Sequence, residues 1–247
     1  MSMSKAKAEN RELPKRFYTQ AGVINEDGQW FIVLDGRAVK TPAKKTLALP
    51  SEALAMAVAV EWEDQEEVIN PFEMPLTRLC NVAIDRMGAA RTEAAEEVAR
   101  FAETDLLCYR SDVPTLAEEQ AKVWDPCLNW AARALDAPLN ITDGLAAISQ
   151  PDVSLNAIRQ HALALDDLRL TALVSAVPIL TSAVLSFQLL HDEASAEDLW
   201  CLSLLEVDFQ ERKWGQDEEA RQAQENKKRD LLACEQLMRL LDQVETH

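Results

Sequence analysis

The fold is decided by an uncharged stretch, Leu170–Leu190, which reads LTALVSAVPILTSAVLSFQLL. Apolar residues occur on every side of a 3.6-residue period, and a helix that is apolar all round belongs in an interior. The length just allows a membrane span. However, Ser, Thr and Gln residues dilute the stretch, Pro178 interrupts it, and no basic cluster flanks it. We therefore expect a buried core helix rather than a membrane anchor.

A second helix is expected after this stretch, because Ser195 and Asp198 have the spacing of a capping box. Its stripe, at alternating three- and four-residue spacing, consists of Leu199, Leu202, Glu206, Phe209 and Lys213. A carboxylate in such a seam is either paired inside the fold or directed at a partner's surface. The internal candidates for Glu206 are Arg78, Arg100 and Lys213. Trp214 and Gly215 indicate the end of the helix, with Gly in the left-handed cap position.

Upstream, residues 14–72 indicate a small antiparallel sheet with a covering helix. Two Asp-Gly turns, Asp27-Gly28 and Asp35-Gly36, separate β-branched and aromatic runs, which is a strong hairpin pattern. The expected strands are 17–24, 29–34, 37–40 and 46–49. Ser51 should cap a helix that extends to about Glu67 and packs on the sheet through Ala53, Met56, Ala57 and Val60. Trp62 lies near its end.

Residues 73–247 are expected to form a larger all-helical domain. Thr115 and Glu118 indicate a capping box that opens a helix with Trp124, Leu128, Ala131 and Leu135 facing inward. Within this part, 106–150 is also compatible with short strands that return to the sheet. The polar stretch 216–230 fits either an exposed helix or a mobile linker. The fold class is therefore α+β, divided near residue 72.

The charge and the cysteines restrict the functional class. The 247-residue chain has a formal net charge of −17, which opposes binding to nucleic acid and to anionic membranes. Its five cysteines are scattered singly, as expected for reduced thiols in a reducing compartment. The first sixteen residues contain no apolar segment of a secretory signal. We expect a cytoplasmic protein, most naturally a bacterial one.

No motif of a catalyst or of a cofactor site is found. Both glycine-rich phosphate-binding patterns and the nucleophile elbow are missing from the sequence. His161, His191 and His247 have no partner at metal-ligand spacing. We expect no enzyme activity, no cofactor and no metal. The alternative is a small-molecule enzyme that uses a carboxylate with Thr77, Arg78 or Arg110 in a cleft between the domains.

Six separated motifs resemble, in content and in order, the ATP synthase F1 complex assembly factor 2 family. The motifs cover residues 17 to 215 and are Phe17-Tyr18 with Trp30–Arg37 and Lys40-Thr41-Pro42, Glu61-Trp62, Met74–Asn81, Glu103–Arg110, Trp124-Asp125-Pro126, and Leu205-Glu206 with Phe209-Gln210 and Lys213-Trp214-Gly215.

This resemblance implies a two-domain chaperone that binds the free alpha subunit of the F1-ATPase. It would cover the surface that the beta subunit later occupies, in the bacterial cytoplasm or, for a eukaryotic member, in the mitochondrial matrix. We also expect a monomer with no nucleic-acid or membrane partner.

The family's important glutamate maps most directly onto Glu206, and the tryptophan of its Glu-Trp motif onto Trp62. The sequence departs from mitochondrial members after Gly215, where it continues with acidic residues 217–219, and these are the alternative location for that glutamate. The expected partner-binding residues are Glu206, Asp208, Phe209, Gln210, Trp214 and Trp62.

Overall fold

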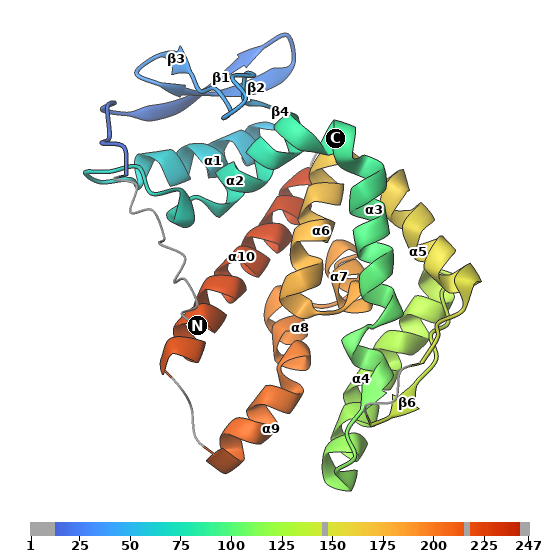
Figure 1. The fold of residues 1–247 in the computed structure, drawn as a ribbon. Helices are drawn as coiled ribbons and strands as arrows, with labels where there is room; N and C mark the ends of the chain where they lie inside the picture. The colour runs from blue at the N-terminus through green and yellow to red at the C-terminus, as the bar shows by residue number, and fades with distance from the viewer. Residues whose placement is uncertain (1–12, 145–147, 215–217, 243–247) are drawn as a thin grey trace, which may run out of the picture.

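The computed structural model describes residues 13–144, 148–214 and 218–242, and it confirms the α+β class: a small antiparallel sheet is followed by a mostly helical region (Figure 1). Its sheet contains β1 (Ala21–Glu26), β2 (Gln29–Leu34), β3 (Arg37–Ala38) and β4 (Ala48–Leu49). Central β2 pairs antiparallel with each of the other three strands. Both Asp-Gly turns form as expected, with all four residues at positive φ. The first strand begins later than expected, at Ala21 rather than Phe17.

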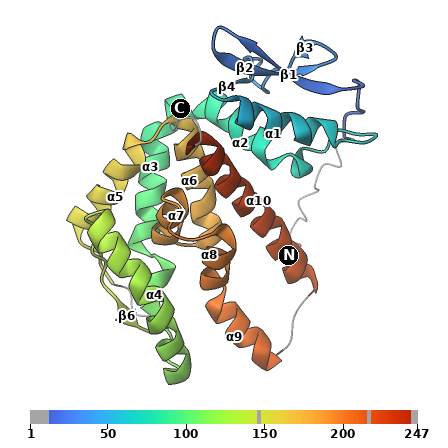
Figure 2. The same ribbon diagram turned by 180° about the vertical axis from the view of Figure 1, so that it is seen from behind.

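The longer helices follow the sheet in chain order. They are α1 (Glu52–Glu63), α2 (Pro75–Val82), α3 (Gly88–Glu103), α4 (Pro114–Ala134), α5 (Asp152–Ala164), α6 (Asp167–Leu180), α7 (Ala183–Leu190), α8 (Ala196–Ser203), α9 (Leu205–Trp214) and α10 (Glu218–Asp242). Figures 1 and 2 show the sheet and α1 at one end of the molecule and α9 at the opposite end. None of the helices in the described ranges is both long and apolar enough to cross a membrane.

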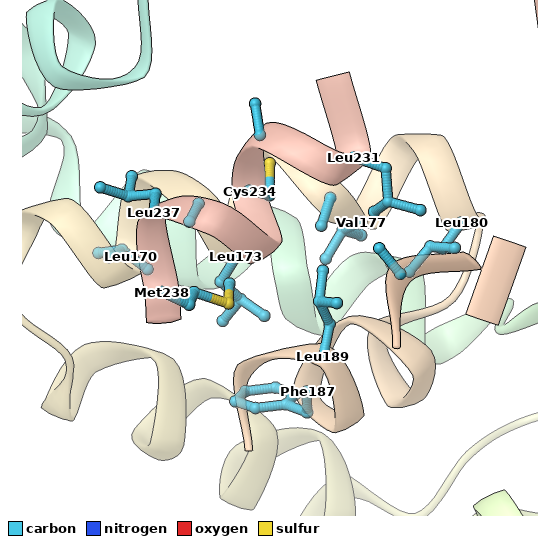
Figure 3. Packing of buried hydrophobic residues seen from close by; sticks show 14 of the residues in the cluster. Leu170, Leu173, Val177, Leu180, Phe187, Leu189, Leu231, Cys234, Leu237 and Met238 are labelled. Carbon is cyan, nitrogen blue, oxygen red and sulfur yellow. The ribbon is translucent and has the colours of Figure 1, made fainter. Parts of the chain in front are cut away.

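The uncharged stretch forms the centre of the helical region, as two helices rather than one. Thr181 adopts the left-handed conformation with φ of 51°, and the Ser182 side chain accepts a hydrogen bond from the Leu185 amide, which starts α7. Leu170, Leu173 and Val177 are buried there, and α10 covers them with its own apolar stripe (Figure 3). Phe187 is also buried, and its ring contacts His161 of α5. The expectation of a buried core segment is confirmed; the expectation of a single helix is wrong because Ser182 caps a new one.

The covering helix α1 packs on the sheet through a different face from the one expected. Its buried residues are Leu54, Ala55, Val58 and Ala59, whereas Met56 and Val60 are 50% and 52% exposed. Apolar residues occupy every position from Ala53 to Val60, so the apolar pattern does not select one face. It also ends at Glu63, four residues before the expected end, with Asp64 as its C-cap.

Glu61, near the end of α1, holds the start of α2. Its carboxylate accepts hydrogen bonds of 2.7 Å from the backbone amides of Leu76 and Thr77 and from the Thr77 hydroxyl. An anionic acceptor at a helix N-terminus satisfies amides that have no partner within the helix. Burial raises the pKa of Glu61, and the hydrogen bonds from Thr77 and Leu76 oppose that shift.

A π-helical turn, η2 (Ala83–Met87), joins α2 to α3 and connects them to the sheet region. Asp85 in this turn accepts hydrogen bonds from the Thr41 hydroxyl at 2.6 Å and from the Ala43 amide at 2.9 Å. Lys45 donates to the Ile84 carbonyl oxygen at 2.7 Å. The widened turn therefore supplies both a carboxylate and a carbonyl group that fix the loop before β4.

Several local expectations are corrected. The capping box at Thr115 is wrong, since Pro114 occupies the first position of α4 and its N-cap, Val113, offers no side-chain hydrogen bond. The inward residues of α4 are buried as expected. The helix expected from Ser195 is interrupted at Leu204, so that α8 and α9 are separate. Residues 218–230 belong to helix α10, while 215–217 lie outside the described residues.

Residues 106–150 do not return to the main sheet. A short 3-10 turn, η3 (Leu106–Cys108), leads into β5 (Tyr109–Arg110), which pairs in parallel with β6 (Thr142–Asp143) as a separate two-stranded sheet. The Gly144 amide donates to the Arg110 carbonyl at 2.7 Å and extends this pairing. A second short 3-10 turn, η1 (Pro71–Glu73), precedes α2. The division of the chain near residue 72 stays a prediction.

A buried carboxylate, Asp105, ties the end of α3 to the start of α7. It accepts hydrogen bonds of 3.1 Å from the amides of Leu107 and Val184. Burial raises its pKa from the ordinary 3.8 to about 6, although hydrogen bonds from Ser182 and nearby amides act in the opposite direction. The carboxyl group therefore binds a proton more readily in the folded than in the unfolded chain.

This pKa predicts the sign of one pH dependence. Between about pH 4 and 6 the folded Asp105 retains a proton that the unfolded chain releases, so its contribution to stability is full below pH 4 and is lost as the pH rises through 6. Asp105→Asn should flatten the dependence of the unfolding free energy on pH in this window. It should also destabilise the protein at pH 7, by roughly 1–3 kcal/mol, because the Asn amide group faces hydrogen-bond donors.

Urea denaturation at several pH values measures both effects. Asp27→Asn is the control, because it is the same replacement in an exposed turn where Asn tolerates positive φ. Equal pH slopes for wild type and Asp105→Asn would show that Asp105 does not titrate in this range.

Candidate functional site

Helix α9 and the start of α4 border a hollow of about 560 Å³. It is lined by Tyr109, Arg110, Ser111, Asp112, Val113, Leu116, Gly144, Glu206, Phe209 and Gln210. We call this cavity the acidic hollow, after Asp112 and Glu206 in its wall. The separate sheet of β5 and β6 forms one side, and α9 forms the other.

Glu206 is held by a side chain that the sequence analysis did not identify. Gln120, which is fully buried, donates from Nε2 to Glu206 Oε1 at 2.8 Å and accepts from the Ser111 amide at 2.7 Å. Two of the three expected partners pair elsewhere among the described residues: Arg78 with Asp230, and Arg100 with Glu97. The Lys213 side chain lies outside the described residues. Glu206 is thus a half-buried carboxylate fixed by a neutral amide.

The sequence pattern that could have identified Gln120 is the same one that identified Glu206. It lies four residues before Trp124 on the stripe that continues to Leu128 and Ala131, so it is a polar residue in an otherwise apolar seam. Two such interruptions, 86 residues apart, meet in the fold.

Arg110 forms the floor of the acidic hollow. Its side chain is 5% exposed, lies 5.3 Å from the centre of the Trp124 ring and pairs with Asp125 at 2.5 Å. Burial lowers its pKa, and the adjacent Asp125 carboxylate opposes that shift. One guanidinium nitrogen, Nη1, is covered and has no hydrogen-bond partner among the described residues. Trp124 in turn donates to the Leu202 carbonyl at 3.1 Å and so fixes the segment before α9.

The structure divides the expected partner-binding residues between two places. Glu206, Phe209 and Gln210 line the acidic hollow, and Asp208 lies on the same helix with an exposed side chain. The Trp214 side chain lies outside the described residues. Trp62 lies at the other end of the molecule, on α1, where its ring contacts Tyr18 at 5.9 Å between centroids.

The residues of the alternative enzyme site do not converge. Thr77 donates to Glu61, Arg78 borders a hollow between α2, α6 and α10, and Arg110 borders the acidic hollow. A larger cavity than the acidic hollow, of about 840 Å³, lies between the sheet and the helices. Its two arginines are paired within the chain, Arg91 with Asp167 at 2.5 Å and Arg169 with Asp166 and Asp242, each at 2.7 Å. In the described part of the chain, no group of three or more His, Cys, Asp or Glu side chains is arranged to hold a metal ion.

The hydrogen bonds of the buried Gln120 side chain predict that its replacement lowers the stability of the protein. Gln120→Leu preserves most of the volume but leaves the Ser111 amide without its acceptor and Glu206 without its donor. We expect a loss of about 1–3 kcal/mol in the free energy of unfolding, measured by urea denaturation. Gln210→Leu, at an exposed position of the same hollow, is the control and should change stability by less than about 0.5 kcal/mol. Equal losses for the two variants would contradict the role of Gln120.

Comparison with known proteins identifies relatives along nearly the whole chain. The family model described as ATP12 chaperone protein matches residues 15–132. The mitochondrial protein atp12 of Schizosaccharomyces pombe is 29% identical over 219 residues, which are 83% of this chain and 75% of that protein. The crystal structure of Atp12 from Paracoccus denitrificans is 38% identical, with a TM-score of 0.86 over 92% of this chain and 98% of that one. The Atu1473 protein of Agrobacterium tumefaciens is 36% identical, with a TM-score of 0.85 over 93% and 87% of the two chains.

Proposed function

This chain belongs to the ATP12 chaperone protein family, and from that premise we propose that it binds the free alpha subunit of F1-type ATP synthase until the alpha-beta complex forms. The role is that of an assembly chaperone without a catalytic step. It acts in the cytoplasm of a bacterium, or in the mitochondrial matrix if the chain is eukaryotic. We take it to act as a monomer.

The observation that carries the proposal is the Glu206 carboxylate, fixed by Gln120 at the edge of the acidic hollow. A carboxylate that is already oriented loses little conformational freedom when a partner's cation reaches it. Tyr109, Val113 and Phe209 supply an aromatic and aliphatic wall beside it. Interfaces commonly combine such an apolar centre with a charged rim.

In the proposed mechanism, α9 and the acidic hollow contact the apolar, beta-facing surface of the alpha subunit. An exposed apolar surface of this kind is prone to aggregation while the beta subunit is absent. The beta subunit then competes for the same surface and displaces the chaperone. No nucleotide hydrolysis is required, because the larger alpha-beta interface supplies the free energy of release.

The proposal predicts selective capture of the free subunit. The tagged chain, co-expressed with the alpha subunit alone, should co-purify with it. Added beta subunit should release the chaperone as the alpha-beta complex forms. Size-exclusion chromatography with quantification of each subunit measures the exchange. Equal binding to free alpha and to the assembled alpha-beta complex would contradict the proposed surface.

Reversal of the Glu206 charge tests the site itself. Glu206→Lys should reduce capture of the alpha subunit by about tenfold or more, because a cation replaces the carboxylate and repels the partner's basic group. The matched control is Glu193→Lys, the same replacement at an exposed residue between α7 and α8. Circular dichroism confirms that both variants fold. Normal capture by a folded Glu206→Lys variant would remove Glu206 from the site.

A further inference from the structure

A second hollow, of about 640 Å³, lies at the end of the molecule opposite α9. Its apolar walls are Phe17, Tyr18, Leu34, Val39 and Trp62, and Arg37 and Lys40 also border it. We call it the aromatic hollow, after its three rings. The segment before β1, the β2 and β3 strands and the end of α1 form its walls.

The aromatic residues are arranged as an incomplete cluster. The Phe17 ring is 73% exposed and touches Tyr18 edge-on, with 5.4 Å between centroids. Tyr18 is fixed by a 2.6 Å hydrogen bond from its hydroxyl to the Trp62 carbonyl oxygen. The Trp62 indole N–H is covered and has no acceptor among the described residues.

The charges around the aromatic hollow favour an acidic occupant. Arg37 makes no ion pair among the described residues, and Lys40 donates to the Thr46 hydroxyl at 2.6 Å rather than to a carboxylate. Asp35 also lines the hollow and keeps its negative charge there, but its carboxylate accepts hydrogen bonds from the amides of Thr19 and Gln20, each at 3.1 Å, and makes no ion pair with Arg37 or Lys40. The two cations on the rim are therefore available to an incoming carboxylate.

The sheet segment that forms most of the hollow has the same polarity, whereas the end of α1, which forms the remaining wall, carries Glu61, Glu63 and Asp64 beside Trp62. From residue 13 to residue 50, six cations stand against the three acids Glu26, Asp27 and Asp35. The whole chain nevertheless has a formal charge of −17, so this sheet region is basic within an acidic protein. The long-range field of the protein opposes an anionic membrane, whereas a concave, ring-lined site with a cationic rim fits a single peptide segment.

We propose that the aromatic hollow is a second docking surface for the alpha subunit and takes an extended segment that carries an aromatic or aliphatic side chain next to carboxylates. The apolar side chain fills the space between Phe17 and Trp62, and the carboxylates meet Arg37 and Lys40. The inference rests on the proposed function for the identity of the partner. Simultaneous contact at both ends of the molecule would raise the affinity above that of either surface alone.

Charge reversal at the rim tests the inference. Arg37→Glu should lower capture of co-expressed alpha subunit by roughly five- to tenfold, whereas Lys44→Glu, the same change in charge on the same loop region but outside the hollow, should not. Arg37→Lys should retain capture, because it preserves the charge. Phe17→Ala should also lower capture while it leaves the thermal midpoint nearly unchanged, since the ring is mostly exposed.

The outcomes separate this inference from the proposed function. If the wild-type chain captures no alpha subunit, the proposed function fails. If wild type and a folded Arg37→Glu variant capture it equally, only the aromatic hollow is refuted. Co-sedimentation with vesicles that contain phosphatidylserine, lost in Arg37→Glu, would instead make the occupant a membrane. A concentration-dependent dimer in analytical ultracentrifugation, also lost in Arg37→Glu, would make it a second copy of this chain. Either result overturns the inference.

Discussion

The helical region depends on one constraint: the pair α6 and α7 has almost no side that water can face. Leu170 and Ala172 lie on nearly opposite sides of α6 and are both buried, as is Phe187 on α7, so other helices must cover the pair on most sides. Helix α10 returns from the end of the chain to do so, and α3 and α5 pack nearby (Figures 1 and 2). The buried carboxylate of Asp105 follows from this requirement, because it accepts a hydrogen bond from the Val184 amide at the start of α7, which water cannot reach.

The covering layer also determines where the polar surfaces lie. Helices α8 and α9 extend from the core, and the hydrogen bond from Trp124 to the Leu202 carbonyl connects α4 to the segment between them. That connection brings Gln120 against Glu206 and opens the acidic hollow beside α9. At the other end, the Glu61 carboxylate and the π-helical turn hold the sheet and α1 against the helices. The acidic hollow and the aromatic hollow therefore lie at opposite ends of the molecule.

The sequence predicted those features that depend on local chemistry. The Asp-Gly turns require positive φ, and an uncharged stretch of this length must be buried, so the sheet and the core were both foreseeable. The buried face of α1 was not foreseeable, because every residue from Ala53 to Val60 is apolar, and Met56 and Val60 have the side chains expected of core residues. The position of Glu206 in an apolar helical stripe was predicted. Its partner Gln120 could not be predicted, because the two residues meet only through the tertiary packing of α4 against α9. The short strands at residue 109 and residue 142 were also misplaced, since two residues of pairing carry no sequence pattern.

The π-helical turn at Ala83–Met87 has a consequence for the geometry of the whole molecule. An additional residue in one turn rotates the following helix by about 100° relative to the preceding one. Figure 1 shows α2 and α3 running in different directions from this turn. The buried residues Leu76 and Cys80 of α2 pack where α1 and α10 lie, whereas Ala95 and Val98 of α3 pack where α5 and α7 lie. The widened turn therefore lets two successive helices bury their apolar sides against different neighbours.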